Sequence, residues 1–241
     1  MKKTRYSAVP ILAMGLMFLC SLGLGAATGS STPAFERVVA RFNTNAPPAY
    51  RAFRRLEAGV AGSSRHGWLE AWTELRPGTG LNVEVVAEGG NEYVRNKVLR
   101  KMLVNEQQLI ARGFPLRAPL EARNYTFEDG GTTPEGLQRI VLRAVRKSDG
   151  VVNGALFISP STGSVTRLEG RLVKSPSFWV KDVDVTWQYA LIAGHLMPVA
   201  MTSTGRVRMV GQSTFKMVYD YVSIQGHPSG ARVLAARAEK R

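Results

Sequence analysis

From residue 124 onward, short alternating segments separated by tight turns dominate the sequence. The predicted strands are 124–128, 137–147, 151–159, 164–174, 178–192, 197–203, 206–210 and 214–224. The clearest turn signals are Asp149-Gly150, Ser161-Thr162-Gly163 and Ser203-Thr204-Gly205. Strands joined by such short turns must be antiparallel, because a parallel return needs a long crossover. This part of the chain therefore predicts a large antiparallel meander.

Two helical segments precede the meander. Thr32 supplies a hydroxyl cap and Pro33 suits the first helical position, so a short helix is predicted to begin there. A longer helix is predicted over residues 91–112, because its apolar residues recur at helical spacing. Asn91 can cap the start of this helix, and Gly113 can end it.

A hairpin separates the two helices. Segments 68–75 and 81–87 alternate apolar with polar residues and flank a Pro-Gly-Thr-Gly turn. Residues 50–56 form a further amphipathic segment, either helix or strand. A sheet of about ten strands curls, and helices on one face would enclose an apolar interior. The predicted fold class is α+β: a large curved antiparallel sheet (a half-open β-barrel) with helices packed against its concave face.

Basic residues alternate with apolar ones along several predicted strands. Arg139, Arg143 and Lys147 share one parity, as do Arg167 and Arg171. Because successive residues of a strand point to opposite faces, one face of the sheet should be wet and basic and the other apolar.

The N-terminus has the three parts of a secretory signal. Lys2, Lys3 and Arg5 precede an apolar run at 8–24, and small residues follow it up to Ala27. We therefore expect export to the periplasm, with cleavage near Ala27. An uncleaved inner-membrane anchor is the alternative, although a run of about 17 residues is short for a bilayer. The expected organisation is a signal peptide at 1–27, a β-rich domain at 28–226 and a basic, disordered tail at 227–241.

The lone cysteine, Cys20, lies within this signal. A domain that begins after Ala27 has no thiol, so it can use neither disulfides nor thiolate chemistry. The formal net charge of +14 favours anionic partners. Outside the cytoplasm these are lipid headgroups, envelope polymers and acidic proteins, and nucleic acid is not expected.

Sequence signatures of catalysis are missing. The chain has no GxSxG, GxxxxGK[ST] or HExxH motif. None of His66, His195 and His227 has another histidine or a cysteine at metal-ligand spacing. Glu70 and Glu74 would share one face of a strand, but ordinary polar positions of a wet sheet face look the same. We therefore expect a protein that is not an enzyme and holds no cofactor or metal.

Large aromatic residues gather on several predicted strands, where core packing explains most of them. A curved sheet lined with them could instead enclose an apolar cavity for acyl chains. Basic residues at the rim of such a cavity would attract anionic headgroups. The candidate ligand-binding residues are Trp68, Trp72, Phe178, Trp179, Trp187, Arg95, Arg167 and Arg171, with Lys97 as a further rim candidate.

Several stretches resemble a known family. Between residues 154 and 226 these are GALFISPSTGSVTRLEGRLVKSPSFWVKDVDV, LMPVAM and FKMVYDYVSI. They look like bacterial outer-membrane lipoprotein-sorting proteins, which belong to the LolA/LolB-like superfamily of periplasmic lipoprotein carriers. WLEAWTEL and EGGNEYVRNKVLRKML look like a distinct subgroup. The resemblance implies a half-open β-barrel that is lidded by helices and holds lipoprotein acyl chains in its hollow.

Two functional hypotheses follow. The first is a monomeric cell-envelope carrier that binds lipid acyl chains or lipoproteins in an apolar cavity, with an anionic membrane surface as a further partner. The alternative is a periplasmic interaction or sensor domain that binds a protein partner or an envelope polymer through exposed aromatic residues around Trp179.

Overall fold

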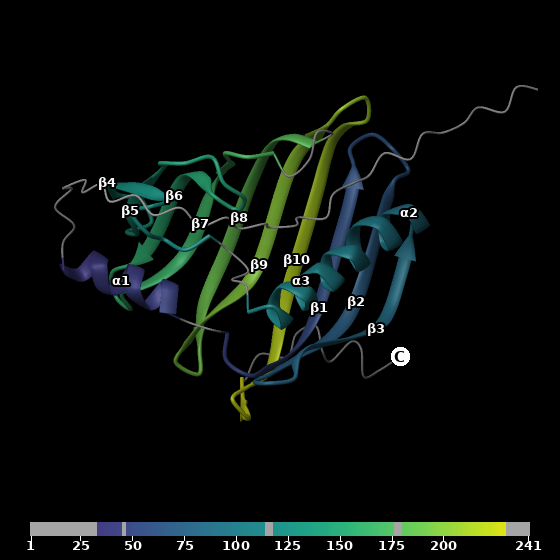
Figure 1. Cartoon of the computed structure of the whole chain (residues 1–241), viewed down its shortest axis with the longest axis horizontal. Coiled ribbons are helices and arrows are strands. Elements are labelled where there is room, and N and C mark those ends of the chain that lie inside the picture. The colour runs from purple at the N-terminus through teal and green to yellow at the C-terminus, as the bar shows by residue number, and fades with distance from the viewer. Residues whose placement is uncertain (1–32, 45–46, 114–117, 176–179, 230–241) are drawn as a thin grey trace, which may run out of the picture.

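The computed structural model describes residues 33–44, 47–113, 118–175 and 180–229. The predicted signal at 1–27 and most of the predicted tail lie outside this part of the chain. Within it, two helical regions lie on one face of a single curved, unclosed antiparallel sheet (Figure 1). The predicted α+β class and the predicted meander are confirmed.

The helices and strands follow the chain in one order. They are α1 (Pro33–Thr44), β1 (Tyr50–Val60), β2 (His66–Arg76), β3 (Gly80–Gly90), α2 (Glu92–Val94), the π-helical turn η1 (Arg95–Leu99), α3 (Arg100–Ala111), β4 (Tyr125–Thr132), β5 (Gln138–Ala144), β6 (Val152–Ser159), β7 (Ser164–Leu172), β8 (Val180–Ile192), β9 (His195–Val207), β10 (Gly211–Ile224) and β11 (His227–Pro228). The strand order is β3-β2-β1-β10-β9-β8-β7-β6-β5-β4, with β11 paired to β10. Pairing of β1 with β10 therefore joins the early hairpin to the end of the meander.

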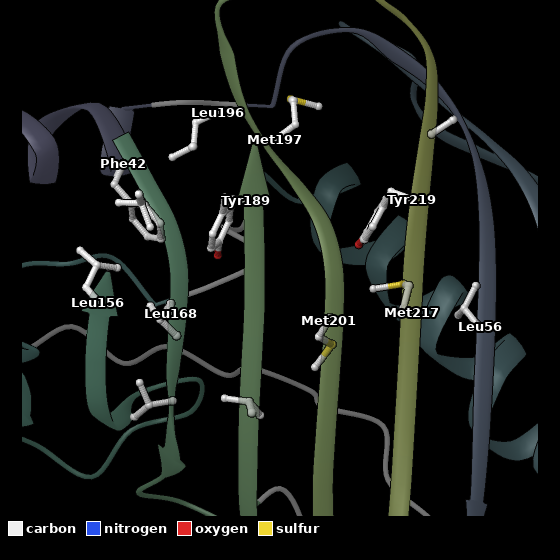
Figure 2. Close-up of a cluster of buried hydrophobic side chains, with 14 of the residues drawn as sticks. Phe42, Leu56, Leu156, Leu168, Tyr189, Leu196, Met197, Met201, Met217 and Tyr219 are labelled. Carbon is white, nitrogen blue, oxygen red and sulfur yellow. The ribbon is translucent and has the colours of Figure 1, made fainter. Parts of the chain in front are cut away.

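Alternation along each strand sorts the side chains between the two faces of the sheet. On the face that the helices cover, which we call the concave face, apolar side chains form one buried cluster. Figure 2 shows Leu156, Leu168, Met201, Met217 and Leu56 of this cluster on successive parts of the sheet. The opposite face is wet and carries exposed arginines, as the alternating sequence predicted.

The helical region after β3 begins and ends where the sequence predicted. The Asn91 side chain accepts a hydrogen bond from the Val94 backbone N–H at 3.2 Å, which satisfies one of the unpaired donors of a helix start. Gly113, at φ +69°, follows the last turn and adopts the left-handed conformation common after helix ends. Leu99 and Leu103 are buried against the sheet. Among the described helices, none is long and apolar enough to cross a membrane.

Helix α1 is fixed to the other half of the concave face. The rings of Phe42 and Tyr189 meet edge to face with their centroids 5.5 Å apart, and those of Phe35 and Phe127 do so at 5.0 Å. Asn43 Nδ2 donates to the carbonyl oxygen of Leu120, and the N–H of Leu120 donates to Asn43 Oδ1, both at 2.7 Å. Figure 1 shows the result: α1 lies over one half of the sheet and α3 over the other.

One predicted turn is wrong. Residues 203–205 do not end a strand but lie inside β9, where Gly205 pairs with Ser213 of β10. Gly205 does not adopt positive φ, so it needs no turn, and pairing on both sides keeps the strand extended. The chain turns later, through Met209 at φ +63°.

The boundary predicted after residue 226 coincides with a turn. Immediately beyond it, His227 and Pro228 form β11 and pair with the end of β10. The remaining tail, residues 230–241, lies outside the described part of the chain, so its predicted disorder stays a prediction.

The close approach of β6 and β7 gives a test of the sheet geometry. Gly154 and Gly170 are partners in register, and a Cβ on Gly154 would overlap the Glu169 carbonyl oxygen and lie 2.5 Å from the Gly170 Cα. Gly154→Ala should therefore lower the free energy of unfolding by about 3 kcal/mol, because backbone atoms cannot yield as side chains do. Urea denaturation followed by circular dichroism measures this loss.

Gly163→Ala is the matched control for this prediction. Gly163 lies in the turn before β7 at φ +60°, and a Cβ added there would meet open space. Its replacement should cost only about 1 kcal/mol of left-handed backbone strain. Equal losses for the two variants would contradict the close approach of β6 and β7.

Candidate functional site

The strand register aligns apolar side chains in one row across the concave face. Each residue of the row is the direct cross-strand partner of the next, through β5, β6, β7, β8, β9, β10, β1 and β2. The residues of this apolar row are, in order, Ile140, Leu156, Leu168, Trp187, Met201, Met217, Leu56 and Leu69. The row runs under both helical regions and crosses the central strands between them.

Two large aromatic side chains on the central strands of the concave face are only half-buried. Trp187 on β8 and Phe215 on β10 are half-buried and pack against the core cluster. Met201 and Met217 lie beside them and are buried. Methionine side chains are flexible and polarizable, so a surface built from them can repack around apolar ligands of different shape.

A buried arginine interrupts this apolar surface. Arg54 lies on β1 at the same parity as Ala52 and Leu56, and its side chain is fully buried. Arg54 Nη2 donates to Glu106 Oε2 of α3 at 2.8 Å and to the Tyr219 hydroxyl at 3.0 Å. The guanidinium carbon lies 4.4 Å from the centre of the Tyr219 ring. One side chain thus links the sheet to α3.

Burial and charge set the protonation of this group. Burial lowers the pKa of Arg54, but the Glu106 carboxylate and the neighbouring tyrosines outweigh it and hold that pKa above its ordinary value. Burial raises the pKa of Tyr50 to about 12 and raises the pKa of Tyr219 above its usual range. The guanidinium therefore stays charged at neutral pH, and the hydroxyls around it stay neutral donors.

The arginine keeps unused hydrogen-bonding capacity. Among the described residues, its Nε and Nη1 atoms have no hydrogen-bond partner, although both are buried. A buried donor without an acceptor costs about 1–3 kcal/mol. These two groups could therefore donate to an additional oxygen atom, beside the carboxylate and hydroxyl groups that already surround the guanidinium.

The aromatic candidate residues that the structure describes lie on different faces of the sheet. Trp187 lies on the concave face in the apolar row. Trp68 and Trp72 lie on the opposite face of β2, where the guanidinium carbons of Arg55 and Arg51 lie 4.9 Å and 4.7 Å from their ring centres. The two remaining candidates, Phe178 and Trp179, lie outside the described residues.

The three arginine candidates are also dispersed, and each has a carboxylate partner. Lys97, the further rim candidate, is exposed in η1. Arg95 pairs with Glu88 at 2.6 Å beside η1. Arg171 pairs with Asp184 at 2.8 Å on the outer face. Arg167 makes two contacts. Its guanidinium carbon lies 4.0 Å from the Phe157 ring centre, and its Nε lies 3.3 Å from Glu169 Oε2.

Three functional candidates carry no motif in the sequence: Arg54, Glu106 and Tyr219 of the buried cluster. The sequence contains one indication of this cluster. Arg54 alternates in step with Ala52 and Leu56 along β1, and a charged residue is unexpected at such an apolar position.

The two glutamates that share a strand face, Glu70 and Glu74, each form an ion pair. Glu70 pairs with Arg55 at 2.6 Å, and Glu74 pairs with Arg76. Within the described residues, no group of three His, Cys, Asp or Glu side chains could hold a metal ion.

Two solved structures are similar to this chain. A LolA superfamily protein from Nitrosomonas europaea aligns at a TM-score of 0.40 and 8% identity, over 78% of this chain and 92% of its own. A DUF1329 family protein from Desulfovibrio piger aligns at a TM-score of 0.41 and 9% identity, over 77% of this chain and 89% of its own. A LolA superfamily protein is thus among the structures that this chain resembles. No family model matches the chain, and no curated protein matches its sequence.

The buried ion pair makes a prediction about stability. Glu106→Met leaves the Arg54 charge buried without its partner, so the free energy of unfolding should fall by about 3 kcal/mol. The double variant Arg54→Met with Glu106→Met removes both charges and should recover most of this loss. Chemical denaturation of the unchanged protein, both single variants and the double variant measures the coupling.

Lys101→Met, at an exposed position of α3, is the control for the helix substitution. It should change the free energy of unfolding by no more than about 0.5 kcal/mol. A double variant that is as unstable as Glu106→Met would contradict the pairing.

Proposed function

We propose that this protein is a non-enzymatic cell-envelope carrier that binds lipid acyl chains or lipoproteins on its concave face. The observation that carries the proposal is the apolar row, which continues between the two helical regions and leaves Trp187 and Phe215 half-buried there. An unbranched acyl chain of a lipid matches such a surface in shape and polarity.

The energetics favour long-chain ligands. Each buried CH₂ group contributes roughly 0.8 kcal/mol, so a chain of several methylenes offsets the cost of displacing side chains from the core. Met201 and Met217 can change rotamer to follow the chain. The free N–H groups of Arg54 would donate to an oxygen of the ligand, such as a carbonyl or carboxylate oxygen.

The helices define where a ligand would lie. Helix α1 is attached through ring contacts and the Asn43–Leu120 hydrogen bonds, whereas α3 is tied to the sheet through Glu106. These are separate attachments on the two halves of the sheet. A ligand over β8, β9 and β10 would therefore lie between α1 and α3, and either helix could adjust without the other.

The N-terminal signal and the charge support the location in this proposal. A chain with a secretory signal at 1–27 would act in the periplasm as a monomer, where anionic lipids and lipoproteins are abundant. Without Lys2, Lys3 and Arg5 of the signal the formal net charge falls from +14 to +11, which still suits those partners.

Phe215→Ser tests the proposal at the half-buried centre of the concave face. The substitution removes apolar contact surface from the ligand site, so the dissociation constant for a fluorescent long-chain fatty acid should rise roughly tenfold. Fluorescence titration of the purified chain measures this constant, and native mass spectrometry detects lipid that co-purifies.

Lys216→Ser is the adjacent control, because Lys216 is exposed on the other face of β10. It should leave the dissociation constant unchanged. A protein that carries no lipid and does not bind the fatty acid would refute the proposal and favour an interaction domain.

A further inference from the structure

We propose that one end of the sheet, around the β9–β10 hairpin, docks on an anionic lipid surface. The docking end consists of Arg65, Lys181, Arg206, Arg208 and Met209. This surface is distinct from the concave face, and the proposal does not depend on what that face binds.

Met209 forms the apolar tip of the docking end. Its side chain is 98% exposed, the highest value among the exposed large hydrophobic residues in the described part of the chain. Its backbone adopts φ +63°, a conformation that costs a side-chain-bearing residue roughly 1–2 kcal/mol. Figure 1 shows the hairpin between β9 and β10 reaching beyond the end of the sheet. The fold itself gains no packing from this methionine.

Basic side chains surround the tip. Lys181 on β8 and Arg206 on β9 are direct cross-strand partners, and both are exposed. Arg65 is exposed in the turn between β1 and β2. That turn lies beside the hairpin, because the Ala61 N–H donates to the Gln212 carbonyl oxygen at 2.8 Å. The docking end therefore gathers charges from three separate segments.

Three basic residues of the docking end have no carboxylate partner among the described residues. Arg171 has its own carboxylate partner, whereas Arg65, Lys181 and Arg206 form no ion pair with any described residue. Like charges directly opposite each other destabilise a strand pair. Asp182 is nearby in sequence and exposed, and it offsets only part of the charge.

An anionic lipid surface would offset the repulsion between Lys181 and Arg206 and would remove the apolar side chain of Met209 from water. Basic residues near such a surface are attracted to its headgroups, and an apolar side chain at the tip can enter the boundary between headgroups and acyl chains. An exposed apolar tip with basic residues around it matches the layered chemistry of a lipid surface, in which anionic headgroups overlie acyl chains. The geometry therefore favours lipid over an acidic protein.

An environment-sensitive dye at the tip tests the docking. Cys20 is the sole cysteine, so Met209→Cys in the Cys20→Ala full chain places the dye at one position. Vesicles that contain phosphatidylglycerol should shift its emission to the blue, and vesicles of phosphatidylcholine alone should not. The dye reports the environment of the hairpin, so binding through another segment leaves it unchanged.

Leu191→Cys in the same background is the matched control. Leu191 is 41% exposed near the β8–β9 hairpin, which the antiparallel order places at the opposite end of these strands. A dye there should not respond to either vesicle. An equal response at both positions, or none at Met209→Cys, would overturn the proposal.

Charge removal provides the second measurement. Lys181→Gln and Arg206→Gln should each weaken phosphatidylglycerol-vesicle binding by roughly fivefold, whereas Lys216→Gln, farther along β10, should have little effect. Circular dichroism confirms that each variant is folded, as expected for exposed positions. Binding that survives both replacements, or that responds to an acidic protein and not to vesicles, would refute lipid docking.

Discussion

The strand register determines which side chains reach the concave face, and the other features of the structure depend on it. Leu168, Trp187, Met201 and Met217 lie on four neighbouring strands and align in a single row. Because side chains alternate with a period of two, a slip of one residue would move this whole row to the wet face. The same register places basic residues on the outer face and leaves the concave face apolar.

A charged group persists on this apolar face because it is paired. Arg54 bonds to Glu106 of α3 and to Tyr219 of β10, so it binds the helix to the sheet. A buried pair of this kind adds little net stability over an apolar pair, but it is costly to break. We interpret it as a device that fixes the position of α3 and offers hydrogen bonds within an otherwise apolar surface.

Periodicity and turn chemistry were sufficient to predict the architecture. Alternation predicted the antiparallel meander, and Asn91 with Gly113 marked the ends of the long helical region. The turn at residues 203–205 was wrong because pairing with both neighbouring strands overrides local turn preference. A local turn pattern gives no information on pairing between strands that are distant in the sequence.

The candidate site was harder to predict from the sequence. An alternating pattern does not say which of two amphipathic faces the helices will cover, so Trp68 and Trp187 looked equivalent, although they lie on opposite faces. The contact between Arg54 and Glu106 joins residues far apart in the chain, from a strand and a helix. Only the packing of α3 on β1 brings these two residues together.

Photo-cross-linking tests the central claim that acyl chains bind to the concave face between α1 and α3. A fatty acid with a diazirine near its methyl end is incubated with the full chain and irradiated, and the labelled peptides are identified by mass spectrometry. We predict labels on concave-face residues of β8, β9 and β10, including Trp187, Met201 and Phe215. Labels confined to the outer face, around Trp68 and Trp72, would contradict the claim, as would the absence of any label.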